Sequence, residues 1–326
     1  MPNFTATYGG YMRIKYLEER KKLLDLKQID ISNREWLYML GEETRHSVAI
    51  EGIFSSEEDL DAVIERNAAS SNVQSEIINY FRAAQFVYDL ALQYRNDYLK
   101  PHYIHVIRTL HSQMFRNVRT PYPTGEFRTS GVDILNARIT PPFDPRGWMD
   151  MFVQYIDYAL ERFPIYGAVA RIHTLFESIH PFCDGNGRVG RLMMNFVLIV
   201  NGYSNISIKG LKEQERLEYY EALEMADSGI EKMFNSKADG SFDEKVALIE
   251  TGDFSALEEL IYSALLDAMD RCIIIASDST KLLDVSQVAE ELGISETAVK
   301  KRIKTGNLIA SKLRTGRWMV FPHNIR

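Results

Sequence analysis

Apolar residues recur every three or four positions along most of the chain, with polar residues between them. This period is typical of amphipathic helices, whereas strands alternate from one residue to the next. After residue 191, for example, Leu192, Met193, Phe196 and Val200 fall on one helical face. The period predicts a mainly α fold, with helices near residues 9–31, 57–66, 73–96, 101–115, 147–163, 165–179, 187–201, 211–228 and 254–276, and one that begins after Ser32 and Asn33 and runs towards Ser47.

Residues 121–134 interrupt the helical pattern. Turn-forming residues cluster there, and the residues between them favour extended backbone. We therefore expect a short β-hairpin between two helical regions.

The composition is that of an ordinary soluble globular protein. The chain has 326 residues, of which 45% are hydrophobic and 25% charged, enough for two domains and a sizeable core. The longest apolar runs, such as residues 196–200, are far too short to span a bilayer, and the first residues do not resemble a signal peptide. Two cysteines, Cys183 and Cys272, do not make a disulfide framework. We expect a reduced, cytoplasmic protein without a membrane partner.

Residues 180–191 form the chemically richest stretch, a loop that leads into a predicted helix. Gly185 and Gly187 let the backbone approach a ligand closely. Free N–H groups at a helix N-terminus bind anions, and Arg188 and Arg191 lie three residues apart on one face. This arrangement suits a di- or triphosphate.

Two residues of the same loop can supply the remaining chemistry. Asp184 can hold the Mg²⁺ that a polyphosphate carries with it. His180 is placed to take a proton from an attacking hydroxyl. No G-x-x-x-x-G-K-[ST] phosphate loop and no kinase catalytic loop occurs in the chain.

Residues 180–191 resemble the Fic (Fido) motif, H-P-F-x-[D/E]-G-N-G-R-x-x-R, and match it at every specified position. The resemblance implies a Fic-type helical bundle and a protein adenylyltransferase, which moves AMP from ATP to a Tyr, Ser or Thr hydroxyl of a protein, the chain itself included. It implies that His180 is the base, Asp184 the Mg²⁺ ligand and Phe182 a core anchor. It further implies phosphate contacts from Gly185, Asn186 and Gly187, from Arg188 to the α/β-phosphates and from Arg191 to the γ-phosphate.

An upstream segment, from Ser47 to Glu51 and Gly52, resembles the inhibitory motif of the same family, [S/T]-x-x-x-E-[G/N]. The resemblance implies that Glu51 pairs with Arg191 and occupies the guanidinium group that should hold the γ-phosphate. A carboxylate competes directly with phosphate for arginine. The same residues are compatible with the reverse reaction, removal of AMP, in which Glu51 would position a water.

Two further segments resemble parts of this family. Residues 125–134 resemble its flap, G-x-[FY]-R-x-x-x-V-x-I, which docks the target protein by strand addition through Phe127, Arg128, Thr129, Ser130, Gly131 and Val132. Residues 219–223 resemble its Y-Y-x-A-L segment, whose tyrosine lies near the adenine; either Tyr219 or Tyr220 fits. We expect His102, His105 and His111 to be solvated or core residues and not a zinc site, and His173 to be buried.

The last 46 residues differ in charge from the rest. From residue 281 onward nine Lys or Arg stand against four Asp or Glu, although the whole chain has a net charge of −7. Their pattern of helix, turn, helix and hairpin resembles a winged helix-turn-helix of the excisionase type. It would bind DNA, or serve as a protein-docking or dimer module. The DNA candidates are Lys300, Lys301, Arg302, Lys304, Arg314 and Arg317.

These observations predict a chain of three parts. Residues 1–100 form an N-terminal helical region with the inhibitory helix, residues 101–278 a Fic catalytic core, and residues 279–326 the winged helix-turn-helix. A DNA-binding regulator with a nucleotide-sensing Fic domain is the alternative function. The sequence leaves open ATP against other nucleotides, the identity of the target, and whether the protein forms a homodimer.

Overall fold

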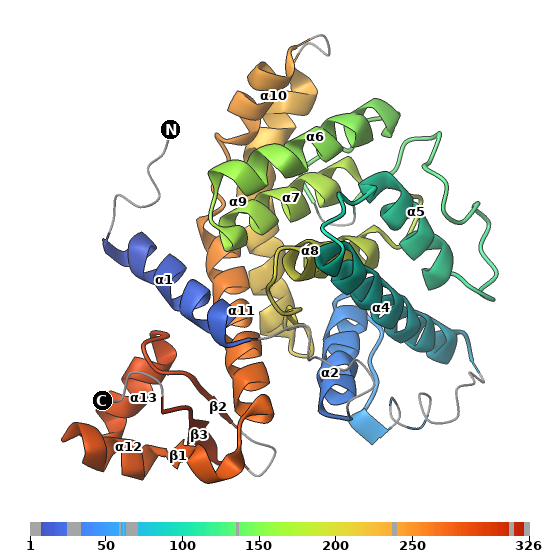
Figure 1. Cartoon of the computed structure of the whole chain (residues 1–326). Coiled ribbons are helices and arrows are strands. Elements are labelled where there is room, and N and C mark those ends of the chain that lie inside the picture. The colour runs from blue at the N-terminus through green and yellow to red at the C-terminus, as the bar shows by residue number, and fades with distance from the viewer. Residues whose placement is uncertain are drawn as a thin grey trace.

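The structure, a computed structural model, describes residues 8–24, 34–58, 60, 62, 71–134, 137–236, 240–312 and 316–322. The described part is mainly helical, with one small antiparallel sheet, which confirms the predicted fold class (Figure 1). The helices are α1 (Tyr8–Leu23), α2 (Arg34–Ile50), α4 (Asn72–Asn96), α5 (Tyr103–Met114), α6 (Arg146–Arg162), α7 (Ile165–Ile179), α8 (Asn186–Val200), α9 (Glu213–Asn235), α10 (Phe242–Ile249), α11 (Ser255–Ala276), α12 (Val285–Leu292) and α13 (Glu296–Lys304).

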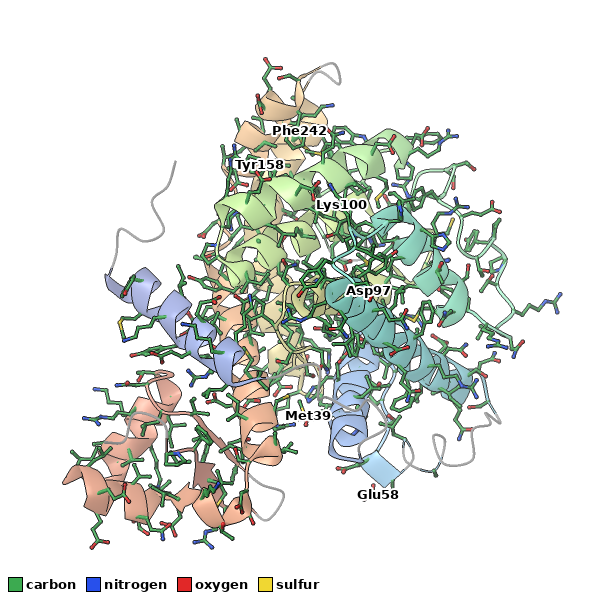
Figure 2. All side chains as sticks on the ribbon, viewed as in Figure 1. Met39, Glu58, Asp97, Lys100, Tyr158 and Phe242 are labelled. Atoms are coloured by element: carbon green, nitrogen blue, oxygen red, sulfur yellow. The ribbon has the colours of Figure 1, made fainter. Side chains whose placement is uncertain are left out.

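The core is built around α7 and α8, which lie at the centre of the bundle (Figure 1). Nearly every side chain of these two helices is buried, so their sequences are apolar on all sides rather than on one face. Helices α4, α6, α9 and α11 pack around them. At one end of the bundle, Tyr158 of α6 and Phe242 of α10 lie side by side, with ring centroids 6.1 Å apart (Figure 2).

Most predicted helices are present, with shifts of a few residues at their ends. The first helix was expected to reach residue 31 but ends at Leu23, and residues 25–33, including the proposed N-cap residues Ser32 and Asn33, lie outside the described part. Most of the helix expected near 57–66 also lies outside it. No helix of the described part is both long and apolar enough to cross a membrane.

The expected hairpin is not formed within residues 121–134 and 137–142, which contain turns and bends but no paired strand. Arg128 explains how this segment is held without a ladder of backbone hydrogen bonds. Its guanidinium group donates to the carbonyl groups of Ser130 (2.7 Å), Pro142 (2.6 Å) and Phe143 (2.8 Å). One buried side chain thus satisfies carbonyls that strand pairing would otherwise satisfy.

The C-terminal segment has the element order that the sequence predicts. Helices α12 and α13 are followed by β2 (Ala310–Lys312) and β3 (Trp318–Val320), and β3 lies between β2 and the short strand β1 (Leu283–Asp284). Gly293 turns the chain between the helices at φ 62°. A small apolar cluster fills this segment, formed by Val285, Val288, Val299, Leu308, Ala310 and Val320.

The C-terminal segment is also joined to the main core. Ile309 is buried in the core cluster of the helical bundle, next to the residues of the smaller cluster. Asp270 of α11 accepts hydrogen bonds from Arg20 of α1 (2.5 Å) and from the backbone N–H of Ala310 (3.2 Å). Arg20 also donates to the carbonyl of Leu308, so α1, α11 and the start of β2 meet at one buried ion pair.

Candidate active site

The loop between α7 and α8 contains His180, Phe182 and Asp184 of the predicted site. Phe182 is fully buried and stacks on His111 with ring centroids 3.9 Å apart, so it anchors the loop as expected. The Asn186 side chain accepts from the Phe182 N–H and donates to the Phe182 carbonyl, both at 2.8 Å. The Asn186 side chain is therefore used to close the loop, which leaves the backbone of the first turn of α8 to meet a ligand.

The start of α8 is open to an anion. Its N-cap residue, Gly185, has φ 77° and carries no side chain that could cap the first turn. Free N–H groups and the helix dipole both favour negative charge at such a place. Gly187 is equally restricted, because a methyl group there would collide with the carboxylate of Glu51. The carboxylate of Glu51 thus lies against the turn where we predict that phosphate binds.

His180 ends α7 in a left-handed conformation, with φ 50° and ψ 60°. This backbone costs roughly 1–2 kcal/mol for a non-glycine residue, so the surroundings must hold it. Arg128 does so by donating to the carbonyls of His180 (2.8 Å) and Ile179 (3.2 Å), while its own N–H donates to the carbonyl of Pro181. Arg128 is only 3% exposed, and its guanidinium group serves to hold the backbone of the loop.

The hydrogen bonds of His180 define its tautomer. Its Nδ1 lies 3.0 Å from the carbonyl of Glu177, which can only accept, so Nδ1 carries the proton and Nε2 is a free base. Burial lowers the pKa of His180 and outweighs the opposing effect of that hydrogen bond. The imidazole is therefore neutral at neutral pH.

Arg191 is buried and bound to the segment that resembles the inhibitory motif. It donates from Nε to the Ser47 hydroxyl (2.8 Å) and from Nη2 to the Ser47 carbonyl (3.0 Å) and the Glu51 carboxylate (2.6 Å). Burial alone would raise the pKa of Glu51, but the charge and hydrogen bond of Arg191 outweigh it and hold that pKa below its ordinary value. The structure thus brings Ser47, Glu51 and Arg191 together.

Arg188 is held from α4. Its Nη1 donates to Glu76 (2.6 Å), a partner that sequence reasoning missed because Glu76 lies 112 residues away. The Nε atom of Arg188 is buried and has no hydrogen-bond partner within the described part of the chain. A buried donor without a partner is costly, so the Nε–H group of Arg188 is suited to donate a hydrogen bond to a phosphate oxygen.

Asp184 is better suited to bind a Mg²⁺ ion that arrives with a nucleotide than to hold a permanently bound Mg²⁺ ion. Its side chain is 64% exposed, and one oxygen accepts from the Gly185 N–H (2.6 Å). Among the described residues no group of three or more His, Cys, Asp or Glu could hold a metal ion. A single carboxylate combined with phosphate oxygens and water is usual for Mg²⁺.

The two tyrosines of α9 have different surroundings. Tyr219 is buried, and its hydroxyl lies 2.6 Å from Nε2 of His173, which is buried as predicted. Tyr220 is 45% exposed and donates to the carbonyl of Ile50 at the end of α2 (2.6 Å). Of the two adenine candidates, Tyr220 is the one that reaches the surface near Glu51.

His111 connects the flap segment with the candidate catalytic loop. Its Nδ1 accepts from the Gly125 N–H (2.7 Å), so its Nε2 donates to the Asp184 carbonyl (3.1 Å). Burial lowers its pKa to about 4, which keeps the ring neutral. The sequence did not indicate this role, because one histidine on an apolar helix face is also typical of a core residue.

A buried acid joins α2 to α4. Glu43 accepts hydrogen bonds from the hydroxyls of Tyr88 (2.5 Å) and Tyr80 (3.1 Å) and from the Asn205 amide (2.8 Å). Burial raises its pKa to about 7 despite these bonds. The Glu43 carboxyl therefore binds a proton more tightly in the folded than in the unfolded protein. This proton binding stabilises the fold fully at low pH, and the stabilisation is lost as pH rises through 7.

We therefore expect Glu43→Gln to remove this pH dependence. Gln cannot ionise. The melting temperature of the variant minus that of wild type should therefore be about 2–4 °C higher at pH 8 than at pH 5.5. Thermal unfolding of both proteins at the two pH values measures this difference. An equal difference at both pH values would show that folding does not raise the pKa of Glu43.

Comparisons with known proteins agree with this geometry. Residues 101–198 match the Fic/DOC family model. A probable protein adenylyltransferase of Aquifex aeolicus is 28% identical over 303 residues, which cover 90% of this chain and 88% of the relative. Protein adenylyltransferase Fic of Aedes aegypti is 32% identical over 192 residues, 56% of this chain, but the match spans only 36% of that relative.

Solved structures show the same fold. A Fic domain containing signaling protein from Bacteroides thetaiotaomicron has a TM-score of 0.59 at 19% identity, covering 80% of this chain and 96% of that one. Fic-1 from C. elegans has a TM-score of 0.58 at 19% identity, covering 81% of this chain and 71% of that one. The matched residues include both the flap segment and the α7–α8 loop, so the chain carries a Fic domain at residues 101–198.

Proposed function

We propose that the protein is an adenylyltransferase that moves AMP from ATP to a hydroxyl group of a protein, and that Glu51 restrains it. The observation that carries the proposal is the neutral His180, with Nε2 as its free base, in the loop that leads to the open start of α8. Arg188 and Arg191 add two buried guanidinium groups to the same helix. The relatives named adenylyltransferases support this assignment.

Each residue of the candidate site would have a separate role in the reaction. The backbone at Gly185–Gly187 and the free Nε of Arg188 would bind the phosphates, and Asp184 would hold Mg²⁺, which supplies charge neutralisation on the polyphosphate. Nε2 of His180 would take the proton of the attacking hydroxyl. The new bond joins that oxygen to the α-phosphorus, and pyrophosphate leaves with the electrons of the bond that breaks.

Glu51 would restrain this reaction by competing for Arg191. In the structure Arg191 donates to Glu51 and Ser47, so it is not available to a γ-phosphate. An ATP molecule without that anchor would bind with its α-phosphate out of line for attack. Ser47 would help to keep Arg191 in this inhibited state, because it is a second partner of the guanidinium group. Gly52, with φ 83°, would form the turn that ends the inhibitory segment.

The target would dock beside the catalytic loop on the flap segment. Thr129, Ser130 and Gly131 are exposed, and no strand pairs with them within the described residues. Phe127 packs on Phe182 with ring centroids 5.5 Å apart, which fixes the start of this segment against the loop. Apart from the Ser130 carbonyl, which accepts from Arg128, the backbone at residues 129–132 can pair with an extended target segment of little defined sequence.

Two labelled forms of ATP test the proposed reaction. The purified protein, wild type and Glu51→Gly, is incubated with Mg²⁺ and a cell lysate, with label on either the α- or the γ-phosphate. Adenylyl transfer places only the α label on protein, whereas phosphoryl transfer places only the γ label. Absence of the α label from protein in both variants would contradict the proposal.

The pH dependence of the reaction should show that His180 acts as a neutral base. Because burial lowers its pKa, we expect the rate of Glu51→Gly at saturating ATP to fall to half of its value at pH 8 only below pH 6.5. Removing Glu51, whose charge raises the pKa of His180, shifts the fall to still lower pH. A rate that is already halved at pH 6.5 would contradict this assignment.

A second function, DNA binding, is favoured by the surface of α13. Lys300, Lys301, Arg302 and Lys304 are all exposed on this nine-residue helix. Arg317 is exposed but paired with Asp284 (2.6 Å), and Arg314 lies outside the described residues. Retention on duplex DNA that weakens steeply with salt, and is lost in Lys301→Glu/Arg302→Glu, would support this function. Retention unchanged in that variant would exclude α13 as the DNA-binding surface.

A further inference from the structure

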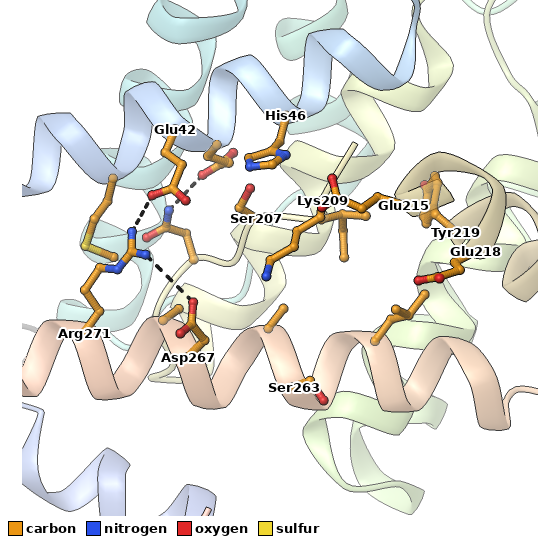
Figure 3. Close-up of a pocket in the computed structure, with 17 residues that line it drawn as sticks. Glu42, His46, Ser207, Lys209, Glu215, Glu218, Tyr219, Ser263, Asp267 and Arg271 are labelled. Atoms are coloured by element: carbon orange, nitrogen blue, oxygen red, sulfur yellow. Dashed lines mark hydrogen bonds and ion pairs between the residues drawn. The ribbon is translucent and has the colours of Figure 1, made fainter. Parts of the chain in front are cut away.

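Helices α2 and α11 face each other across a cavity of about 240 Å³ (Figure 3). Glu42, Glu43 and His46 line it from α2, and Leu260, Asp267 and Arg271 line it from α11. At one end of the cavity the Arg271 guanidinium group reaches across to the Glu42 carboxylate at 2.5 Å. This ion pair joins the two helices where their side chains otherwise leave open space.

The helix on one side of this cavity carries the proposed inhibitory residues. Beside Glu42, the Glu43 carboxylate ties α2 to Tyr80 and Tyr88 of α4. At the end of α2, Ser47 and the adjoining Glu51 bind Arg191. Tyr220 donates to the Ile50 carbonyl there. Glu42 lies on α2, and Glu51 directly follows Ile50, the last residue of that helix, nine residues after Glu42. A helix is stiff over this length, so a change of tilt at Glu42 is transmitted to Glu51.

The helix on the other side is firmly fixed. Asp270, the residue before Arg271, is 5% exposed and accepts hydrogen bonds from Arg20 and from the Ala310 N–H. Arg271 therefore projects from a segment of α11 that two other parts of the chain hold in place. Its ion pair is partly shielded, with 25% of the Arg271 side chain and 31% of the Glu42 side chain exposed.

We propose that Arg271 is a positioning residue that keeps the inhibitory carboxylate on Arg191. By holding Glu42, Arg271 prevents α2 from tilting into the adjacent cavity, and Glu51 stays on the guanidinium group that the γ-phosphate requires. Loss of the pair frees α2 to tilt and increases the fraction of molecules in which Arg191 is available. The inference rests on the proposed restraint by Glu51, which it extends to a second helix of the fold.

The kinetic test uses Arg271→Met with and without Glu51→Gly. We expect Arg271→Met alone to raise the rate of α-label incorporation about three- to five-fold, the weight of one partly shielded ion pair, and to lower the KM for ATP. In the Glu51→Gly background the same substitution should have no effect, because there is no carboxylate left to position. An equal rise in both backgrounds, or no rise in either, would overturn the proposal.

A matched control separates positioning from general stability. Arg13→Met removes another ion pair of α11, with the exposed Glu259, and does not touch α2, so it should leave the rate unchanged. Glu42→Gln breaks the Arg271–Glu42 ion pair from the α2 side and should reproduce the effect of Arg271→Met. Arg271→Lys keeps the positive charge and should retain much of the restraint on α2. These variants also replace Arg271→Met if that protein fails to fold.

Hydrogen exchange gives a readout that does not depend on activity. Backbone amides of residues 43–52 should exchange faster in Arg271→Met than in wild type or Arg13→Met, since α2 opens more often. Unchanged protection of these amides would overturn the inference even if the proposed reaction were correct. Faster exchange together with an inactive Glu51→Gly protein would instead overturn the proposed reaction and leave Arg271 as a restraint on α2.

Discussion

Glu51→Gly should increase AMP incorporation by about 10- to 100-fold over wild type. This range corresponds to the free energy of one hydrogen bond between charged groups. Without Glu51, the Arg191 guanidinium group is available to donate that hydrogen bond to the γ-phosphate. The substitution also removes the oxygen that lies against Gly187 at the start of α8. Initial rates with ATP labelled at the α-phosphate, measured at equal protein concentration, give the ratio.

Glu57→Gly is the matched control for this result. Glu57 is an exposed carboxylate shortly after the end of α2, and its nearest charged partner is Arg45 at 3.6 Å. Its removal changes net charge by the same amount but leaves Arg191 bound, so the rate should stay within two-fold of wild type, about the range of a surface ion pair. Equal activation by both substitutions would show that the effect is one of general charge and not of the pair with Arg191.

His180→Ala should abolish the activity that Glu51→Gly releases, with a loss of about 10²- to 10⁴-fold. Nε2 of His180 is the free base of the site, and Ala offers no proton acceptor in its place. ATP binding should be retained, because Arg188 and the backbone of the first turn of α8 remain. Single-turnover labelling measures the loss, and a thermal shift with ATP and Mg²⁺ checks binding.

The outcome for His180 can also be negative in an informative way. If the double variant loses both labelling and the thermal shift, the site has collapsed, because His180 is the left-handed residue that ends α7. In that case His180→Asn is the better test, since Asn tolerates this conformation while it lacks a basic nitrogen. Labelling that persists in both variants would assign the base to another residue.

The part of the site that lies close together in sequence was predictable. Residues 180–191 form a loop and a helix start because of glycines, an apolar run and local hydrogen bonds, all of which act over a few residues. The pairing of Glu51 with Arg191, which spans 140 residues, came from a resemblance and not from spacing. Glu76, Glu42 and Arg271 gave no signal, since a charged residue on an exposed helix face looks the same whether or not a partner lies opposite.

The flap segment shows where pattern recognition was misleading. Turn residues at both ends of the segment favoured a hairpin, but no strand pairs there within the described residues. The guanidinium group of Arg128 is instead buried among five carbonyl groups, those of Ser130, Pro142, Phe143, Ile179 and His180. Those acceptors come from three separate places in the chain. Only the folded structure brings them together, so a sequence cannot distinguish this arginine from one that faces solvent.

The ion pair of Arg20 with Asp270 has a consequence for the order in which the chain is assembled. The two residues are 250 positions apart, and Arg20 also donates to Leu308, still later in the sequence. While the protein emerges from a ribosome, α1 is made early but its buried charge has to wait for these partners. We therefore expect α1 to dock late in folding, although it is synthesised before α11 and β2.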